Sequence, residues 1–217
     1  MALPLTEPPT NMKKFVIYTA TLLIFLSVLY NSVYIEDLQE HKSALSDKEF
    51  NAAKYVIDEL FPELQEQPSL EAGIFLDSLS ADFKGFSARH GKKLGISEDY
   101  NFLIHGTARV INILEEDVLL ELNNPRVQRI RLATDFIFGN TLRDASGLVD
   151  IGTYQNTMDF NEISIALNQQ VRDQVLPPFK KEVSEGAVVT FKGGVKVSVR
   201  SKELPSLRVI PFMLEIE

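Results

Sequence analysis

The residues best suited to chemistry lie between two apolar stretches in the second half of the chain. Arg143 and Asp144 are adjacent charges, Asn156 and Asn168 add amide groups, and Gly139 allows the backbone to turn just before them. Two interpretations are open. The charges pair with neighbours and backbone to order a long loop, or the cluster binds a hydroxylated or anionic ligand. The candidate site residues are therefore Gly139, Arg143, Asp144, Asn156 and Asn168.

The sequence offers little support for catalysis or metal binding. His41, His90 and His105 are scattered and lack the spacing of paired metal ligands. The absence of cysteine excludes thiolate catalysis, disulfide bonds and thiolate zinc sites. No nucleophile elbow of the G-x-S-x-G type is present, and residues 85–93 lack the strand and the hydroxyl residue of a phosphate loop. We therefore expect no enzymatic activity, no cofactor and no metal.

Composition and charge narrow the class of protein further. The chain has 217 residues and a formal net charge of -8, and 45% of its residues are hydrophobic. This length is typical of one or two domains. A nucleic-acid-binding protein would present a basic surface, so the acidic balance argues against a nucleic-acid partner.

The elements that must position the polar cluster are predicted to be strands and one helix. The helix is expected over about residues 159–176, where apolar residues recur every four positions before Pro177-Pro178. Short runs rich in Val, Ile, Leu and Phe, bounded by turn residues, predict strands. These runs cover residues 101–113, 118–122, 127–138, 187–199 and 207–216. Three strands, a helix and two strands is the order of a small, partly open antiparallel β-barrel of the OB type.

A helical part is predicted before the strands, over residues 46–95. Ser46 and Glu49 form a capping box, and apolar residues then recur at helical spacing up to Pro62. A second helix is expected to start after Pro68-Ser69. The predicted fold class is therefore α+β, with the OB-like barrel over residues 100–217.

The N-terminal part contains a long uncharged segment, Phe15 to Tyr34, which is long enough for a transmembrane helix. A cleaved signal peptide would need a small-residue cleavage site, and a buried globular helix of this composition near a terminus would be unusual. Lys13 and Lys14 precede the segment and acidic residues follow it, which places the N-terminus in the cytoplasm. We expect a cytoplasmic tail (1–14), a transmembrane signal anchor (15–34), a stalk (35–45) and a periplasmic domain (46–217).

Three short stretches resemble an uncharacterised family of predicted bacterial periplasmic lipoproteins. They are residues 139–145 (GNTLRDA), the segment with Tyr154 and Asn156, and residues 166–168 (ALN). The family motif is similar to G-T-A-L-R-D-A, then F-x-N-Q, then A-L-N. The chain departs from it at Asn140, Tyr154 and Thr157, and it lacks the cysteine to which the lipid would be attached.

The resemblance implies a function in carbohydrate uptake, because members of that family are typically encoded beside sugar ABC transporters. We expect a non-enzymatic accessory or binding module in the bacterial inner membrane, with its bulk in the periplasm. Its expected partners are the membrane, through Phe15–Tyr34, and an ABC transporter permease or a sugar-binding protein. The alternative is a structural envelope or protein–protein interaction module without a small-molecule ligand.

Overall fold

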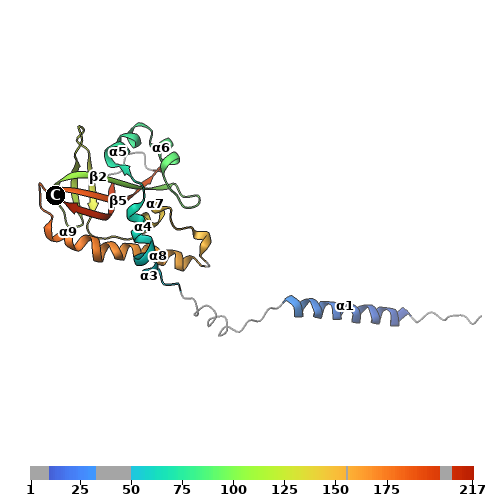
Figure 1. Ribbon diagram of the computed structural model, residues 1–217. Coiled ribbons are helices and arrows are strands. Elements are labelled where there is room, and N and C mark those ends of the chain that lie inside the picture. The colour runs from blue at the N-terminus through green and yellow to red at the C-terminus, as the bar shows by residue number, and fades with distance from the viewer. Residues whose placement is uncertain (1–9, 33–49, 155, 201–206) are drawn as a thin grey trace, which may run out of the picture. The chain divides into compact units, whose positions relative to one another are not determined.

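The computed structural model describes residues 10–32, 50–154, 156–200 and 207–217. Contacts divide the chain into two compact units, Met1–Glu49 and Phe50–Glu217. Figure 1 shows the helices and strands of both units. The predicted stalk and the capping box at Ser46 and Glu49 lie outside the described residues.

The described part of the first unit is the helix α1, Thr10–Ser32. Inside it, the hydroxyl groups of Thr19 and Thr21 donate hydrogen bonds to backbone carbonyls one turn earlier, over 2.7 and 2.9 Å. The predicted anchor over residues 15–34 is not found as a membrane-spanning helix. Among the described residues, no helix combines the length and the apolar character needed to cross a bilayer.

The second unit begins with short helical segments and one short strand. They are α3 (Ala52–Tyr55), a π-helical turn (Val56–Leu60), α4 (Phe61–Glu66), β1 (Leu70–Glu71), α5 (Ala72–Ala81) and α6 (Phe83–His90). The Asn51 side chain accepts a hydrogen bond from Lys54 N and so caps α3.

Two expected helix ends are wrong for the same reason. Pro62 lies in the first turn of α4, and Pro177-Pro178 lies in the first turn of α9, Leu176–Glu182. Proline has no N–H to donate inside a regular α-helix, but it can be accommodated where the hydrogen-bond pattern of the helix changes. A π-helical turn precedes each helix, over Val56–Leu60 and over Val171–Val175, so both helical runs continue where a stop was expected.

Six strands form one sheet. After β1 they are β2 (Asp99–Ile113), β3 (Asp117–Leu122), β4 (Arg129–Ala133), β5 (Val188–Ser198) and β6 (Arg208–Ile216). The pairing runs β1–β2–β3–β4–β6–β5, and β5 also pairs with β2, so five strands form a closed cycle of pairs. The strand β1 was not expected, and β4 is shorter than predicted.

The sheet is irregular where β5 meets β6, as the proline in β6 indicates. The register shifts between Lys192 and Gly193, and Gly193 then pairs with Pro211. Proline cannot donate to the ladder, so a bulge or an edge is expected at such a position. At this point the backbones approach closely: a Cβ on Gly193 would lie 2.7 Å from the backbone oxygen of Ile210.

Two hydrophobic clusters use opposite faces of the long strand β2. Phe102 and Ile104 belong to a cluster with Phe75 of α5, whereas Leu103 belongs to a second cluster. Alternate residues of a strand point to opposite faces, which explains the division. The second cluster joins the sheet to residues of α3, α4, α7 and α8, and in Figure 1 these helices lie on the other side of the sheet from α5 and α6.

The segment around Arg143 and Asp144, which was expected to be a long loop, contains structure of its own. It includes α7 (Thr141–Ser146) and a 3-10 turn (Ile151–Thr153), and α8 then runs over Thr157–Gln170. Leu142 and Ala145 of α7 are buried in the second cluster. The helix α7 contacts β2, β5 and α8, so it packs between the sheet and α8 (Figure 1).

We expect Gly193→Ala to lower the free energy of unfolding by about 1–3 kcal/mol, because overpacking against backbone forces the strands apart. Chemical denaturation measures this change. Gly106→Ala in β2 is the matched control, since its nearest neighbours are 3.4 Å away and the added methyl makes ordinary contacts. Equal stability of the two variants would contradict the close approach of β5 and β6.

Candidate functional site

The chain leaves β4 through a turn that α8 holds in place. Phe136 and Gly139 have left-handed backbone angles, with φ of 48° and 90°. The backbone amide of Phe136 donates to Asp135 Oδ1 over 2.8 Å. From α8, Asn168 Nδ2 donates to the carbonyl oxygen of Gly139 over 2.7 Å. Two of the predicted site residues are therefore in direct contact.

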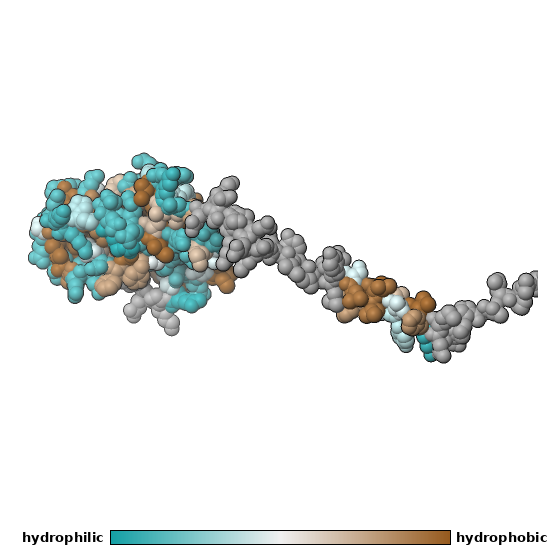
Figure 2. Space-filling model, turned by 90° about the horizontal axis from the view of Figure 1, so that it is seen from below, coloured by the Kyte–Doolittle hydropathy of each residue, from teal (hydrophilic) through white to brown (hydrophobic). Residues whose placement is uncertain are grey.

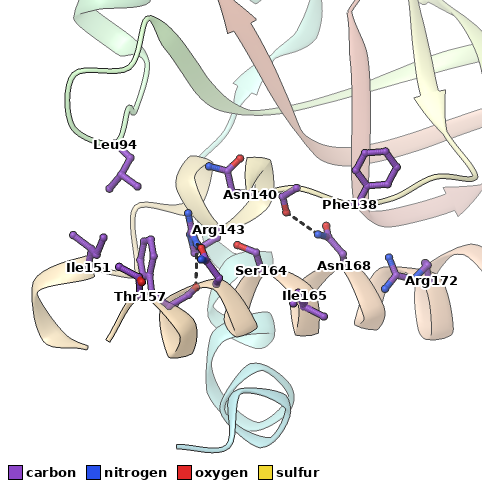
Figure 3. Close-up of a pocket in the computed structure, with 13 residues that line it drawn as sticks. Leu94, Phe138, Asn140, Arg143, Ile151, Thr157, Ser164, Ile165, Asn168 and Arg172 are labelled. Carbon is purple, nitrogen blue, oxygen red and sulfur yellow. Dashed lines mark hydrogen bonds between the residues drawn. The ribbon is translucent and has the colours of Figure 1, made fainter. Parts of the chain in front are cut away.

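Arg143 projects from α7 onto α8 and is only 3% exposed. Its Nε donates to Asp144 Oδ1 over 2.9 Å, and its Nη1 donates to the carbonyl oxygen of Phe160 over 3.0 Å. The guanidinium carbon also lies 3.6 Å from the centroid of the Phe160 ring, a cation–π contact. Figure 3 shows the bond from Arg143 to α8. This side chain joins the two helices.

Asp144 completes the buried network from the other side. Both side chains of the Arg143–Asp144 pair are almost fully buried, and the second bond of the pair, from Nη2 to Oδ1, measures 2.8 Å. Asn140 Nδ2 donates to Asp144 Oδ2. Lys196 Nζ donates to Asn140 Oδ1 over 3.2 Å, which links the network to β5. These contacts support the structural interpretation of the charged pair.

The C-terminal end of α7 is held separately, by a lysine from the segment after α6. Lys92 Nζ donates to the carbonyl oxygen of Ser146 over 2.6 Å, and a cation is favourable at a helix C-terminus. Burial lowers the pKa of Lys92 below its usual value. The helix ends at Gly147, which has a left-handed φ of 63°. Side chains from other elements therefore hold both ends of α7.

A cavity of about 550 Å³ opens beside Arg143, between α7, α8 and the turn after β4. Figure 3 shows its lining side chains, with Leu94 and Ile151 at one end and Phe138 and Arg172 at the other. The lining consists of Leu94, Phe138, Gly139, Asn140, Arg143, Ile151, Thr157, Phe160, Asn161, Ser164, Ile165, Asn168 and Arg172. Its volume is in the range of small-molecule binding sites.

Ser164 is the one lining residue of the described part with a buried side-chain atom that lacks a hydrogen-bond partner. The residue is 8% exposed, and its Oγ neither donates to nor accepts from any described residue. An unsatisfied buried hydroxyl costs free energy that a ligand or water can recover. In Figure 3 this side chain points from α8 toward the α7 side of the cavity.

The rim of the cavity is apolar and exposed. The Phe138 side chain is 69% exposed, and Ile165 of α8 is 62% exposed. Leu94 and Ile151 are also among the exposed large hydrophobic residues. An apolar rim around a few convergent polar groups is typical of ligand sites.

Asn156 does not take part in the cavity. It is exposed, and its Oδ1 accepts from the backbone amide of Asp159 over 2.9 Å, so it is the N-cap of α8. The helix expected from about residue 159 therefore begins two residues earlier, at Thr157. Of the five predicted site residues, Gly139, Arg143 and Asn168 line the cavity, Asp144 supports Arg143, and Asn156 lies elsewhere.

Two lining residues of α8, Asn161 and Ser164, were not predicted from the sequence. They precede the predicted Asn168 at intervals of three and four, which places all three on one face of the helix. This polar stripe beside buried Ile163 and Leu167 was the signal that could have found them.

Aromatic rings connect the start of the unit to the cavity. Phe50 packs against Tyr154 with ring centroids 5.4 Å apart, and Tyr154 lies 5.9 Å from Phe160. Tyr55 contacts Phe50, with ring centroids 5.7 Å apart.

The phenol of Tyr55 has a raised pKa, about 12. Burial is the largest cause, and the neighbouring Tyr154 and Glu59 contribute further, so the phenol stays neutral well above its usual range.

The described residues hold no arrangement of three or more His, Asp or Glu side chains suited to a metal ion. The cavity lining itself carries no carboxylate and no histidine. What the cavity can do chemically is donate and accept hydrogen bonds and contact apolar groups.

We expect Arg143→Ala to lower the free energy of unfolding by about 3–5 kcal/mol, because it leaves the buried Asp144 carboxylate without its partner. Chemical denaturation provides the measurement. The control Arg129→Ala removes an exposed pair with Glu121 and is expected to change stability by less than about 1 kcal/mol. An R143A protein as stable as the wild type would show that the pair does not hold α7.

The fold and the family follow from comparison with known proteins. The chain is similar to an OB-fold protein of Thermotoga maritima, with 25% identity and a TM-score of 0.70, over 78% of this chain and all of that one. A search of curated proteins found no match. The sequence model of a family described as predicted periplasmic lipoprotein (DUF2291) matches residues 23–215, which is most of the chain. The chain therefore belongs to this family of predicted periplasmic lipoproteins, a domain family of unknown function.

Proposed function

We propose that this protein is a non-enzymatic binding module of the periplasm, and that its cavity between α7 and α8 takes a small hydroxylated ligand. The observation that carries the proposal is the buried, unpartnered hydroxyl of Ser164 in a cavity of about 550 Å³. A ligand hydroxyl can satisfy this group, and the amides of Asn161 and Asn168 provide further donors and acceptors on the same helix face.

The lining chemistry supports binding rather than catalysis. General acid–base catalysis needs a group that titrates near the working pH, and nucleophilic catalysis needs a base beside the nucleophile. The hydroxyls of Thr157 and Ser164 have no such base among the lining residues. Exposed Phe138 offers an apolar face of the kind that sugar rings contact.

We propose a role in sugar uptake for this module, together with an ABC transporter permease or a sugar-binding protein. The support is the resemblance of residues 139–168 to the family motif, whose members are typically encoded beside sugar ABC transporters. The family description, predicted periplasmic lipoprotein, agrees with the compartment in which such an accessory module would work.

We further propose that α1 associates with the membrane at the periplasmic boundary. Many of its described side chains are apolar and exposed, among them Phe15, Leu22 and Phe25, and Figure 2 shows apolar residues along the visible face of the helix. Removing such side chains from water is favourable. The sequence contains no cysteine for a lipid, so this segment is the candidate for attachment.

Replacing Leu22 and Phe25 by lysine is expected to move the protein from the membrane fraction to the soluble fraction. The reason is that placing a charged side chain in hydrocarbon costs free energy. Cell fractionation followed by immunoblotting measures the distribution. The control Ile57→Lys changes an equally exposed apolar residue of the second unit and leaves the distribution unchanged. Membrane association that survives both lysines would contradict this role of α1.

We expect a monosaccharide to raise the melting midpoint of the full chain by about 5–10 °C at 100 times its Kd, since a ligand of the native state stabilises it. Thermal-shift measurement against a panel of neutral, acidic and phosphorylated sugars tests this. Ser164→Ala should reduce the ligand-induced shift without lowering the midpoint of the free protein, because the hydroxyl makes no bond there.

Ser80→Ala is the control, since this α5 hydroxyl bonds to Leu76 O and lies outside the cavity. It should leave the ligand-induced shift unchanged. A panel in which no sugar changes the midpoint would overturn the binding proposal and favour an interaction module without a small-molecule ligand.

A further inference from the structure

We propose that the ligand is an anionic sugar, and that Arg172 binds its carboxylate or phosphate group; this rests on the proposed function. Arg172 lies in the π-helical turn Val171–Val175 directly after α8 and lines the cavity at the end near Phe138 (Figure 3).

Arg172 is held in place by neutral groups. Its Nη1 donates to the carbonyl oxygen of Ile137, and its Nη2 donates to Gln169 Oε1 over 2.7 Å. A guanidinium has five N–H donors, so these two bonds orient the fork and leave donors for a ligand. Neither partner carries a charge that would neutralise it.

The other arginine of the cavity is different. Arg143 is paired with Asp144, and its donors are directed to Asp144, Asn161 and the Phe160 carbonyl. Within the described ranges, the arginines without an ion pair are Arg109 and Arg172. Arg109 is exposed on β2, where it donates to Gly186 O, so Arg172 is the unpaired arginine of the cavity.

The cavity lining carries two arginines and no carboxylate, although the chain as a whole is acidic, with a formal net charge of -8. Asp173 follows Arg172 in the sequence, but it is not a lining residue, and its carboxylate accepts from Gln169 Nε2 over 2.7 Å. Lys196, which also lies outside the lining, is a further cation beside Asn140. A concave site with one sign of charge concentrates ligands of the opposite sign.

The remaining polar groups suit the neutral part of such a ligand. The Ser164 hydroxyl is more than nine-tenths buried and unpartnered, and Asn168 uses Nδ2 for Gly139 O. Its Oδ1 accepts no bond from the described residues and is available to a sugar hydroxyl. A sugar ring bound against α8 with an acidic group at Arg172 therefore provides hydrogen-bond partners for Ser164, Asn168 and Arg172.

The test compares three probes on the full chain: glucose, glucuronate and glucose 6-phosphate. Thermal shift and isothermal titration should give at least about tenfold tighter binding for one or both anionic probes than for glucose, because charge-assisted hydrogen bonds are the stronger ones. The preference should fall as salt is added. The anionic probe that binds more tightly identifies the acidic group of the ligand as a carboxylate or a phosphate.

Arg172→Gln should remove the preference for the anionic probe and leave any binding of glucose in place. Arg172→Lys keeps the charge but loses the fork, so it should retain only part of the preference. Arg109→Gln is the control, because this arginine has no ion pair but lies outside the cavity. It should change neither the preference for the anionic probe nor the binding of glucose.

The outcomes separate the two proposals. Glucose binding as tightly as both anions, or an R172Q protein that keeps the full anion preference, overturns the assignment of Arg172 and leaves the binding module intact. Binding of none of the three probes, nor of any sugar in the wider panel, overturns the proposed function itself. If R172Q melts too low for titration, the salt dependence of the wild type and the R172K variant decide the role of the charge.

Discussion

The guanidinium of Arg143 is the contact on which the geometry of the cavity depends. It joins α7 to α8 through the Phe160 carbonyl and carries the charge that permits Asp144 to be buried. Two charges in a protein interior are stable only when each has its partner and its hydrogen bonds. Both helices contribute to the walls of the cavity, so its present form depends on this pair.

The sheet contributes the platform on which α7 rests. Gly194 of β5 lets the helix approach, since a Cβ there would lie 2.8 Å from Leu142 Cδ2. Leu142 and Ala145 enter the same hydrophobic cluster as Leu103 of β2 and Leu167 of α8. The position of α8 relative to the strands therefore depends on one short helix, α7, which packs against both. The strands of an OB-like fold serve here as support, while helices form the cavity.

The parts of the fold that could be predicted are those with a strong local signal. Ile130 and Leu132 alternate with Arg129 and Arg131, and the structure buries the first two in β4. The six-residue helix α7 is too short for a periodic pattern, and its conformation depends on contacts with β2, β5 and α8. The strand β1 has two residues and exists only by pairing with β2.

The same division applies to the cavity. Arg143 and Asn168 could be singled out because charge and amide groups among apolar residues need partners. Ser164 taken alone could not, because a serine inside a helix is ordinary and often bonds to its own backbone. Its unpartnered state arises only when α7, α8 and the turn after β4 come together.

The π-helical turn Val171–Val175 makes the cavity sensitive to chain length as well as to side-chain identity. Such a turn holds one residue more than regular α-helical geometry requires, and the surplus residue changes the direction of the side chains around it. Arg172 lies in this turn, and its guanidinium is oriented by its bonds to the Ile137 carbonyl and to Gln169. A one-residue deletion here would therefore move Arg172 around the helix axis and change the direction of α9, while every other lining residue kept its identity.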